Sequence, residues 1–250
     1  MDIYDQVKEV YDNSNLYNNE FANYDDDFTF WEYWIKKISP SCVLEIGIGN
    51  GRLLKLLSPM VKEYDGLELS KGIINNLNLD SINFRGNIYN QDMKKINIKK
   101  KYDLIILPFN TFVYLYSLDD IVNFFNGIDK ISHENTIVII DIFNPGTDDL
   151  IDIKKYRLCN IFNIEGRFYK LYEKHSYDAD KQIITYYKKY VNNKKSMELC
   201  LPVRVFFHQE LLNLIKCNGF DVINNFGDYN NEKYTSGSRK QIIFLKKRCK

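Results

Sequence analysis

The sequence has no excess of one charge. Its 34 basic and 33 acidic residues leave a formal net charge of +1. Such a balance provides neither the basic surface of a nucleic-acid-binding protein nor a polybasic patch for a membrane surface. The short basic runs at 99–101 and 246–248 are typical of solvated loops and tails. We therefore expect no nucleic-acid partner and no membrane partner.

Cysteine is scarce, and long apolar runs are missing. The five cysteines are odd in number and show no metal-ligand spacing, so we expect no bound metal and a reducing, cytoplasmic location. No apolar run approaches the roughly 20 residues that span a bilayer. The segment 1–5 lacks the basic flank and apolar stretch of a signal peptide, so we expect none.

Internal repeats and flexible linkers are also missing. A chain of 250 residues with 45% hydrophobic residues can form one α/β domain with a sizeable core. We expect four parts within this single domain. They are an N-terminal helical lid at 1–38, a ligand-binding core at 39–149, an antiparallel β insert or substrate cap at 150–207, and a C-terminal helix with strands at 208–250.

Short apolar runs alternate with amphipathic segments in the core, after two helical pieces within 3–38. Continuous apolar strands separated by helices predict a parallel sheet that is covered on both faces. Ligands bind such sheets beyond the carboxyl ends of the strands. The expected strands are Val43–Ile46, Tyr64–Leu67, Ile88–Gln91, Tyr102–Leu107 and Thr136–Ile142, and the expected helices include Leu53–Leu57, Gly72–Leu79 and Leu118–Ile131.

The pattern changes after residues 144–146, where antiparallel strands replace the strand–helix units. Turn-forming residues at 178–181 and 192–195 separate long β-prone stretches. A final helix and two strands complete a seven-stranded, mostly parallel sheet. The antiparallel strands are Phe168–Tyr177, Gln182–Val191 and Glu198–Phe207, the helix is Gln209–Cys217, and the last strands are Phe220–Asn225 and Gln241–Lys246.

A glycine-rich loop follows the first expected strand. Gly47, Gly49 and Gly51 allow a sharp turn and a close approach of backbone N–H groups to a ligand. Dinucleotide-binding folds have a similar loop, but Arg52 stands where their third glycine would be. Glu45 ends the apolar strand, and a buried carboxylate there needs a partner. The ammonium group of an amino-acid ligand or a local hydrogen-bond network would supply one, and capping of the backbone turn is the alternative.

A second acid, Glu68, ends the next strand. A carboxylate at this position can accept both hydroxyl protons of a ribose, as in dinucleotide sites. The alternative is a capping role at the helix that starts near Ser70. The glycine spacing with Glu45 favours S-adenosylmethionine (SAM) over a nicotinamide cofactor, and Glu68 indicates a nucleoside.

Residues 43–58 and 64–70 resemble the first two motifs of class I SAM-dependent methyltransferases. The resemblance covers nearly the whole chain and implies a Rossmann-like fold, SAM as cofactor and S-adenosylhomocysteine as product. It implies that Asp92 and Met93 meet the adenine, with 87–88 as a competing register, and that the loop at Pro108 packs on the methionine part. The cofactor-binding residues that we expect are Tyr11, Glu45, Gly47, Gly49, Gly51, Arg52, Glu68, Leu69, Asp92, Met93, Pro108 and Phe109.

The acceptor side of the reaction is less defined. His208 and His175 are candidates for contact with the acceptor, because an unperturbed histidine titrates near neutrality and can act as a base. Tyr114 is the other candidate, because it lies a few residues beyond Asn110, on the helix side of the loop after the fourth expected strand. Six tyrosines of the insert either wall an aromatic pocket, form the face of a homodimer, or pack across strands. They are Tyr169, Tyr172, Tyr177, Tyr186, Tyr187 and Tyr190.

Together, the motifs predict a SAM-dependent methyltransferase that acts on a small-molecule acceptor at nitrogen or oxygen. The Pro108-Phe109-Asn110 order does not match the motif of methyltransferases that modify amino groups of nucleic-acid bases. Two alternatives remain at this stage. One is a SAM-binding protein without catalysis, and the other is an NAD-dependent oxidoreductase, which the missing third glycine disfavours.

Overall fold

The computed structural model describes residues 2–79, 84–193 and 195–248, so Lys194 of the turn predicted at 192–195 lies outside the described residues. The chain forms two compact units. One comprises Met1–Tyr24 with Pro145–Val205, and the other comprises Asp25–Asn144 with Phe206–Lys250. The helical segment expected at 1–38 is thus divided between the units. Within the described residues, no helix is long and apolar enough to cross a membrane.

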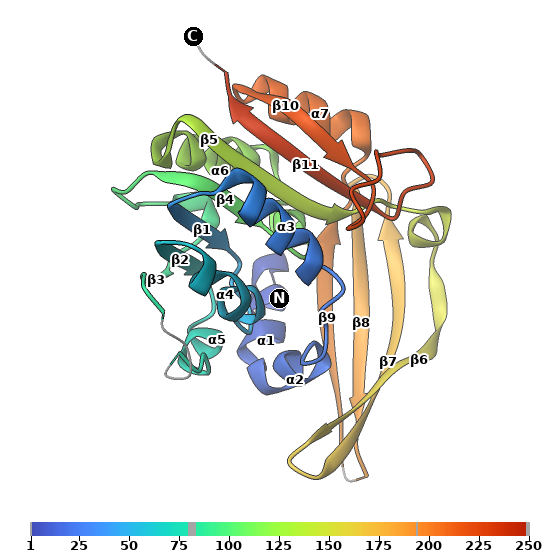
Figure 1. Cartoon of the computed structure of the whole chain (residues 1–250). Coiled ribbons are helices and arrows are strands. Elements are labelled where there is room, and N and C mark those ends of the chain that lie inside the picture. Colours follow the sequence, from blue (N-terminus) through green and yellow to red (C-terminus); the bar gives the residue numbers. More distant parts are fainter. Residues whose placement is uncertain (1, 80–83, 194, 249–250) are drawn as a thin grey trace. The chain divides into compact units, whose positions relative to one another are not determined.

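The unit that contains the glycine loop is built on a seven-stranded sheet of order β10-β11-β5-β4-β1-β2-β3 (Figure 1). Strands β1 to β5 pair in parallel, and β11 pairs antiparallel with both β5 and β10. The predicted seven-stranded, mostly parallel sheet is therefore confirmed. The strands are β1 (Cys42–Ile46), β2 (Glu63–Glu68), β3 (Ile88–Asn90), β4 (Tyr102–Leu107), β5 (Ser132–Phe143), β10 (Phe220–Phe226) and β11 (Lys240–Lys247).

Helices cover both faces of this sheet, as Figure 1 shows with α3 and α4 in front of the strands and α6 behind them. The α3 and α4 face has an aromatic core in which Trp31 is fully buried. The helix α5 is shorter than predicted because the asparagine-rich segment after it has low helix propensity. The helices are α3 (Phe28–Ile38), α4 (Arg52–Leu57), α5 (Lys71–Asn75), α6 (Leu118–Ile131) and α7 (His208–Cys217), with short 3-10 helices η1 (Ser58–Met60), η2 (Met93–Lys95) and η3 (Thr111–Tyr114).

The helix α6 begins at a reciprocal cap. The Ser117 hydroxyl accepts a hydrogen bond from the backbone N–H of Asp120 at 3.0 Å, and the Asp120 carboxylate accepts one from the backbone N–H of Ser117 at 3.1 Å. Loss of such a cap typically costs about 1 kcal/mol. We therefore expect Ser117→Ala to lower the free energy of unfolding by about 1 kcal/mol in urea titrations. Ser236→Ala, in an exposed loop, is the control and should change it little.

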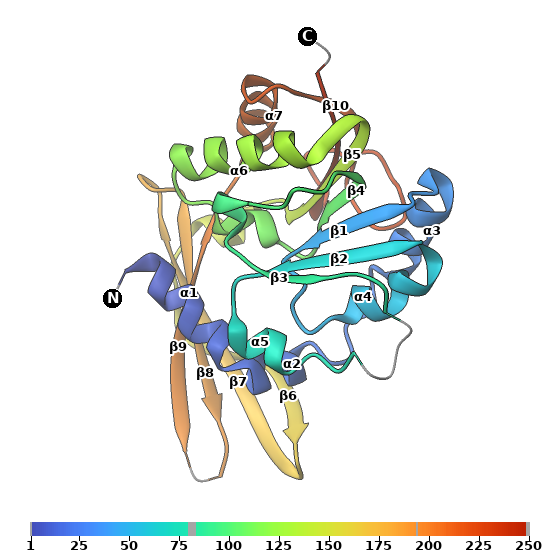
Figure 2. The same ribbon diagram turned by 90° about the vertical axis from the view of Figure 1, so that its left-hand side faces the viewer.

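The other unit is an antiparallel sheet of order β6-β7-β8-β9, with α1 and α2 lying along one face of it (Figure 2). The strand β6 is an addition to the prediction. Its lysines, arginine and asparagines are irregularly interspersed with apolar residues at a sheet edge, so its apolar pattern is weak. The elements are α1 (Ile3–Asp12), α2 (Ser14–Glu20), η4 (Thr147–Leu150), β6 (Ile153–Ile164), β7 (Arg167–Asp178), β8 (Ile183–Val191) and β9 (Ser196–Arg204).

One detail of this unit corrects a sequence-based expectation, and a second favours one of the alternatives for the insert tyrosines. The first N-terminal helical piece is two helices, because the Asn13 side chain and backbone both donate to the carbonyl of Glu9 and end α1. Among the insert tyrosines, Tyr190 is buried in the core under α1 and α2, and Tyr169 packs against that core. These two rings therefore pack across strands and do not wall an open surface.

A buried ion-pair network ties α2 to the same sheet. The Lys188 ammonium group lies 2.7 Å from Glu20 Oε1 and 2.6 Å from Glu173 Oε1, and the Tyr190 hydroxyl donates to Glu20 Oε2 at 2.7 Å. Two carboxylates share one buried ammonium group here, and its pKa is raised above the ordinary lysine value, because the attraction to Glu20 and Glu173 outweighs the opposing effect of burial. The network explains why residues 3–20 belong to this unit.

Candidate functional site

The glycine loop has a left-handed backbone conformation, which glycine adopts more readily than residues with a Cβ atom. The φ angles of Gly47, Gly49 and Gly51 are +78°, +55° and +73°, in the left-handed region. A Cβ atom at Gly47 would overlap with the Thr111 side chain, approaching its Cγ2 to 2.7 Å. Two features therefore favour glycine at position 47, namely the left-handed backbone and the close approach of the Thr111 side chain.

Glu45 lies at the end of β1 and is 2% exposed. Its Oε2 accepts a hydrogen bond from the Tyr64 hydroxyl at 2.7 Å. Burial raises the pKa of Glu45 to about 8, and the bond from Tyr64 and the charge of Arg52 only partly oppose the rise. The partner that the sequence required is thus a tyrosine on the neighbouring strand, and the expected contact with a ligand ammonium group stays a prediction.

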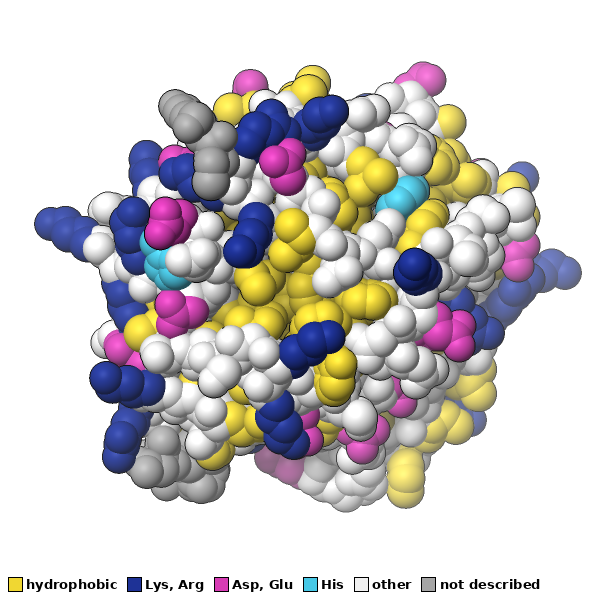
Figure 3. Space-filling model, turned by 45° about the horizontal axis from the view of Figure 1, so that its top comes forward, with side chains coloured by type: hydrophobic (Ala, Val, Ile, Leu, Met, Phe, Trp, Pro, Cys, Tyr) yellow, Lys and Arg dark blue, Asp and Glu magenta, His cyan; other side chains and the backbone are white. Residues whose placement is uncertain are grey.

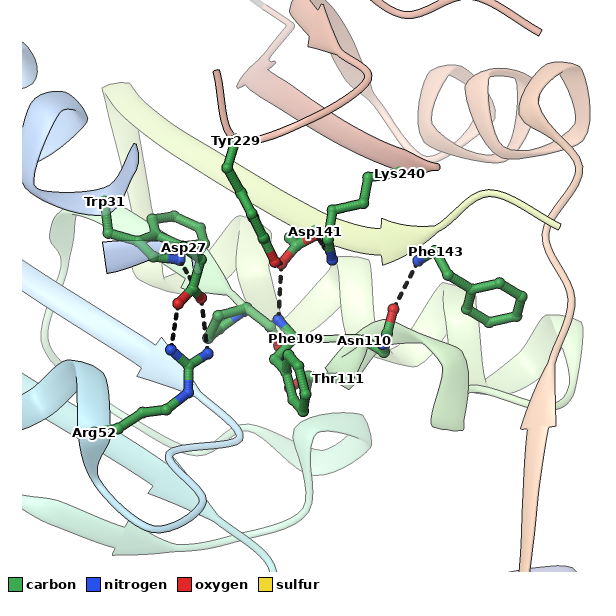
Figure 4. Close-up of polar contacts among 11 residues, drawn as sticks. Asp27, Trp31, Arg52, Phe109, Asn110, Thr111, Asp141, Phe143, Tyr229 and Lys240 are labelled. Atoms are coloured by element: carbon green, nitrogen blue, oxygen red, sulfur yellow. Dashed lines mark hydrogen bonds and ion pairs between the residues drawn. The ribbon is translucent and has the colours of Figure 1, made fainter. Parts of the chain in front are cut away.

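Arg52, the first residue of α4, forms a two-bond ion pair with Asp27 just before α3. Its Nη2 lies 2.7 Å from Asp27 Oδ2, which also accepts from the Trp31 indole N–H at 2.9 Å (Figure 4). The guanidinium carbon lies 5.3 Å from the centre of the Phe109 ring. Sequence reasoning missed Asp27. A signal was present, since Asp27 and Trp31 are four residues apart and lie on one helix face.

Glu68 closes β2 beneath the glycine loop. Its Oε2 accepts from the backbone N–H of Gly49 at 3.2 Å, and its Oε1 accepts from the backbone N–H of Ser70 at 2.9 Å. Burial raises the pKa of this carboxyl, and backbone hydrogen bonds from Ser70, Gly49 and Leu69 only partly oppose the rise. Glu68 therefore accepts the backbone N–H of the residue that precedes α5, as in the capping alternative. The N-cap of α5 is Ser70, whose side chain accepts from the backbone N–H of Ile73. Leu69 follows as an exposed side chain.

Asp92 and Met93 follow β3 after one intervening residue, and both are partly buried. The Asp92 side chain accepts from the backbone N–H of Lys94 at 2.9 Å and caps η2. Asn87, which the competing register would use, precedes β3 at the opposite end of the strand and donates its backbone N–H to Asp65. The structure thus places Asp92, and not Asn87, at the edge where Glu68 ends.

The loop after β4 contains two consecutive non-glycine residues with left-handed backbone, Phe109 at φ 49° and Asn110 at φ 68°. The Thr111 hydroxyl donates to the carbonyl of Pro108 at 2.9 Å. The carboxylate of Asp141 on β5 accepts from the backbone N–H of Phe109 at 3.0 Å (Figure 4). This loop, the glycine loop and the end of β2 therefore meet at one edge of the sheet.

The three candidates for acceptor contact lie in different surroundings. His208 begins α7, with Nδ1 3.0 Å from Gln241 Oε1 and Nε2 3.0 Å from Asn225 Nδ2, and its ring stacks on Tyr234 at 3.8 Å. Both ring nitrogens are thus held within the protein. Tyr114 ends η3 in the same unit and is partly buried. The catalytic roles of these residues stay predictions.

The remaining predicted residues belong to the other unit. His175 lies on β7, its Nε2 is 3.1 Å from the carbonyl oxygen of Asp148, and its ring lies 5.5 Å from that of Tyr186. Tyr11 lies on α1, with its ring 5.1 Å from that of Tyr17. Its expected contact with the cofactor, like the homodimer expected through the insert, stays a prediction.

The charged side chains on the surface are mixed in sign. Figure 3 shows basic and acidic groups scattered around the displayed face, with hydrophobic side chains gathered at its centre. Within residues 2–79, 84–193 and 195–248, no group of three or more His, Cys, Asp or Glu side chains could hold a metal ion. The loops that follow β1, β2 and β4 meet at the carboxyl edge of the parallel strands, and this edge is the candidate site.

Comparison with solved structures identifies the fold of the chain. The methyltransferase CcbJ of Streptomyces caelestis has a TM-score of 0.84 at 15% identity, covering 98% of this chain and 100% of that one. The chain has the methyltransferase fold. A SAM-dependent methyltransferase of Clostridium acetobutylicum gives 0.78 at 17% identity, with coverage of 99% and 100%. The sugar N-methyltransferase KedS8 of a Streptoalloteichus species gives 0.72 at 12%, with coverage of 90% and 87%. No protein-family model and no curated protein matches the chain.

Proposed function

We propose that the protein is a SAM-dependent methyltransferase whose acceptor is a small molecule. The observation that carries the proposal is the convergence of Glu68, the glycine loop and the loop after β4 at one edge of a methyltransferase fold. Ligands bind parallel sheets at this edge. The same edge has no glycine at the third position of the dinucleotide pattern, because Arg52 stands there and pairs with Asp27.

The nucleoside half of the ligand is assigned to Glu68 and Asp92. The Glu68 carboxylate accepts backbone hydrogen bonds from Gly49, Leu69 and Ser70, and a carboxylate offers about four lone-pair sites in all. Acceptor capacity for a ribose hydroxyl therefore remains after the backbone bonds are made. Asp92 and Met93, next along the edge, are assigned to the adenine.

The amino-acid half is assigned to the space bordered by Glu45, the glycine loop and Phe109. A ligand ammonium group beside Glu45 would favour the ionised carboxylate, whose burial is otherwise costly. SAM supplies an electrophilic methyl group that an acceptor attacks in line. The protein's part in such a reaction is to orient the two molecules and to exclude water.

A small acceptor is supported by two observations. The net charge of +1 and the mixed surface charges do not suit a polyanionic substrate. Among the proteins of similar structure, KedS8 is a sugar N-methyltransferase and MtfA is a glycopeptide N-methyltransferase. We propose nitrogen or oxygen as the methylated atom.

Ligand binding to variants at the two ends of β2 tests the cofactor assignment. We expect wild-type protein to bind S-adenosylhomocysteine in isothermal titration, and Glu68→Ala to weaken binding at least about tenfold, since a hydrogen bond to a charged group contributes about 1.5–3 kcal/mol. Glu63→Ala, at the opposite end of the strand, removes an ion pair with Lys100 and is the matched control.

The controls separate this proposal from its alternatives. Glu63→Ala should keep the wild-type affinity within about threefold. A wild-type protein that binds NADH and not S-adenosylhomocysteine would contradict the proposal. Methyl transfer to small amines, amino sugars and phenols from labelled SAM would then separate an enzyme from a protein that only binds SAM.

A further inference from the structure

Asp141 is a fully buried carboxylate near the carboxyl end of β5, and the cofactor assignments above give it no contact with the ligand. Its Oδ2 accepts from the backbone N–H of Phe109 at 3.0 Å and from the Tyr229 hydroxyl at 2.8 Å. Its Oδ1 lies 3.0 Å from the Lys240 ammonium group (Figure 4). Its backbone carbonyl accepts from the N–H of Asn110 at 2.9 Å. One residue thus holds two consecutive N–H groups of the loop after β4.

This loop needs to be held. Phe109 and Asn110 both have left-handed backbone, at φ 49° and 68°. Asparagine tolerates that conformation, but for a residue such as phenylalanine it costs about 1–2 kcal/mol. The Asn110 side chain is fixed as well, because its Oδ1 accepts from the backbone N–H of Phe143 on β5 at 2.6 Å. Strained backbone of this kind persists only where the surroundings determine it.

The imposed conformation has a consequence at the glycine loop. It sets the Phe109 ring 5.3 Å from the Arg52 guanidinium carbon and places the Thr111 side chain where a Cβ atom of residue 47 would lie. The segment 108–111 therefore borders the part of the site that we assign to the amino-acid half of the ligand. Relaxation of the loop would move both side chains.

We propose that Asp141 is a positioning residue that holds segment 108–111 in the conformation that receives the amino-acid part of SAM. The inference rests on the proposed function and deepens it. Lys240 neutralises the carboxylate and Tyr229 orients it. Oδ2 of Asp141 is thereby held where it accepts a hydrogen bond from the backbone N–H of Phe109. Asp141 acts through the loop and does not itself touch the reacting atoms.

The chain contains a matched control for this carboxylate. Asp65 on β2 is equally buried and has the same set of donors, namely a lysine, a tyrosine hydroxyl and a backbone N–H. It lies 3.0 Å from Lys100 Nζ, accepts from the Tyr102 hydroxyl at 2.6 Å, and accepts from the N–H of Asn87 at 2.7 Å. Asn87 and Lys100 precede β3 and β4, and Tyr102 is the first residue of β4, so Asp65 lies away from the carboxyl edge.

The test compares Asp141→Asn with Asp65→Asn by titration calorimetry with two ligands. S-Adenosylhomocysteine carries the amino-acid part, and 5′-methylthioadenosine has the nucleoside and sulfur without it. We expect Asp141→Asn to weaken binding of S-adenosylhomocysteine at least about tenfold and of methylthioadenosine by less than about threefold. Asp65→Asn should leave both affinities within about threefold, although both variants lose thermal stability.

A milder pair of variants applies if either asparagine variant does not fold. Tyr229→Phe and Tyr102→Phe each remove one hydroxyl donor and keep the ring, and only Tyr229→Phe should weaken S-adenosylhomocysteine binding selectively. Equal weakening of both ligands, or the same pattern in the Asp65 pair, would overturn the positioning role and leave the proposed function intact. Failure of wild-type protein to bind either ligand would overturn the proposed function, and the inference with it.

Discussion

Gly47→Ala is expected to abolish S-adenosylhomocysteine binding and to lower the free energy of unfolding by about 3 kcal/mol. Two costs add in this variant. The left-handed backbone at φ +78° costs a residue with a Cβ about 1–2 kcal/mol. The new methyl group also overlaps with the Thr111 side chain, and such overpacking typically costs about 1–3 kcal/mol. The glycine loop and the loop after β4 must then separate, which opens the site.

The control for the backbone cost is Gly219→Ala after α7. Its φ is +86°, and a Cβ atom there would meet nothing within 4 Å, so only about 1–2 kcal/mol should be lost. In urea titrations, the double variant Gly47→Ala/Thr111→Ala should be more stable than the sum of the single changes predicts. Strict additivity would show that the overlap is absent, and unchanged ligand binding would show that the loop does not form the site.

The elements that were predicted well from the sequence are those that residue type and neighbouring residues determine. The left-handed glycines at 47, 49 and 51 follow from residue type, and the cap at Ser117 fixes the start of α6. The parallel strands were evident because burial on both faces makes them continuously apolar. The strand β6 was missed because an edge strand carries polar residues, and those residues resemble a loop.

The side-chain contacts that complete the site join residues far apart in the sequence, so the sequence pattern around each residue does not predict them. The Glu45 carboxylate meets Tyr64 nineteen residues later, and Arg52 meets Asp27 from a different helix, so both pairs depend on the packed sheet. Asp141 could have been found by the reasoning that singled out Glu45. It is also an acid near the carboxyl end of an apolar strand, where a buried charge requires partners.

Glu45→Gln is expected to make the protein more stable relative to wild type as the pH rises. The folded protein binds the Glu45 proton with a pKa of about 8, whereas a carboxyl in the unfolded chain has a pKa near the ordinary value of 4.5. Unfolding therefore releases a proton between these values, so wild-type stability falls as the pH rises through this window. Glutamine does not titrate, and the variant lacks this loss.

The difference in the free energy of unfolding between the variant and wild type should grow by about 3 kcal/mol from pH 5 to pH 8, since one pKa unit corresponds to about 1.4 kcal/mol. Urea titrations at both pH values measure it, and the exposed Glu134→Gln is the control, with a small change expected. A difference independent of pH would show that Glu45 is ionised in the folded protein. A cation beside Glu45 would reverse the cost of its charge, so S-adenosylhomocysteine should raise the melting temperature of wild type more than that of the variant.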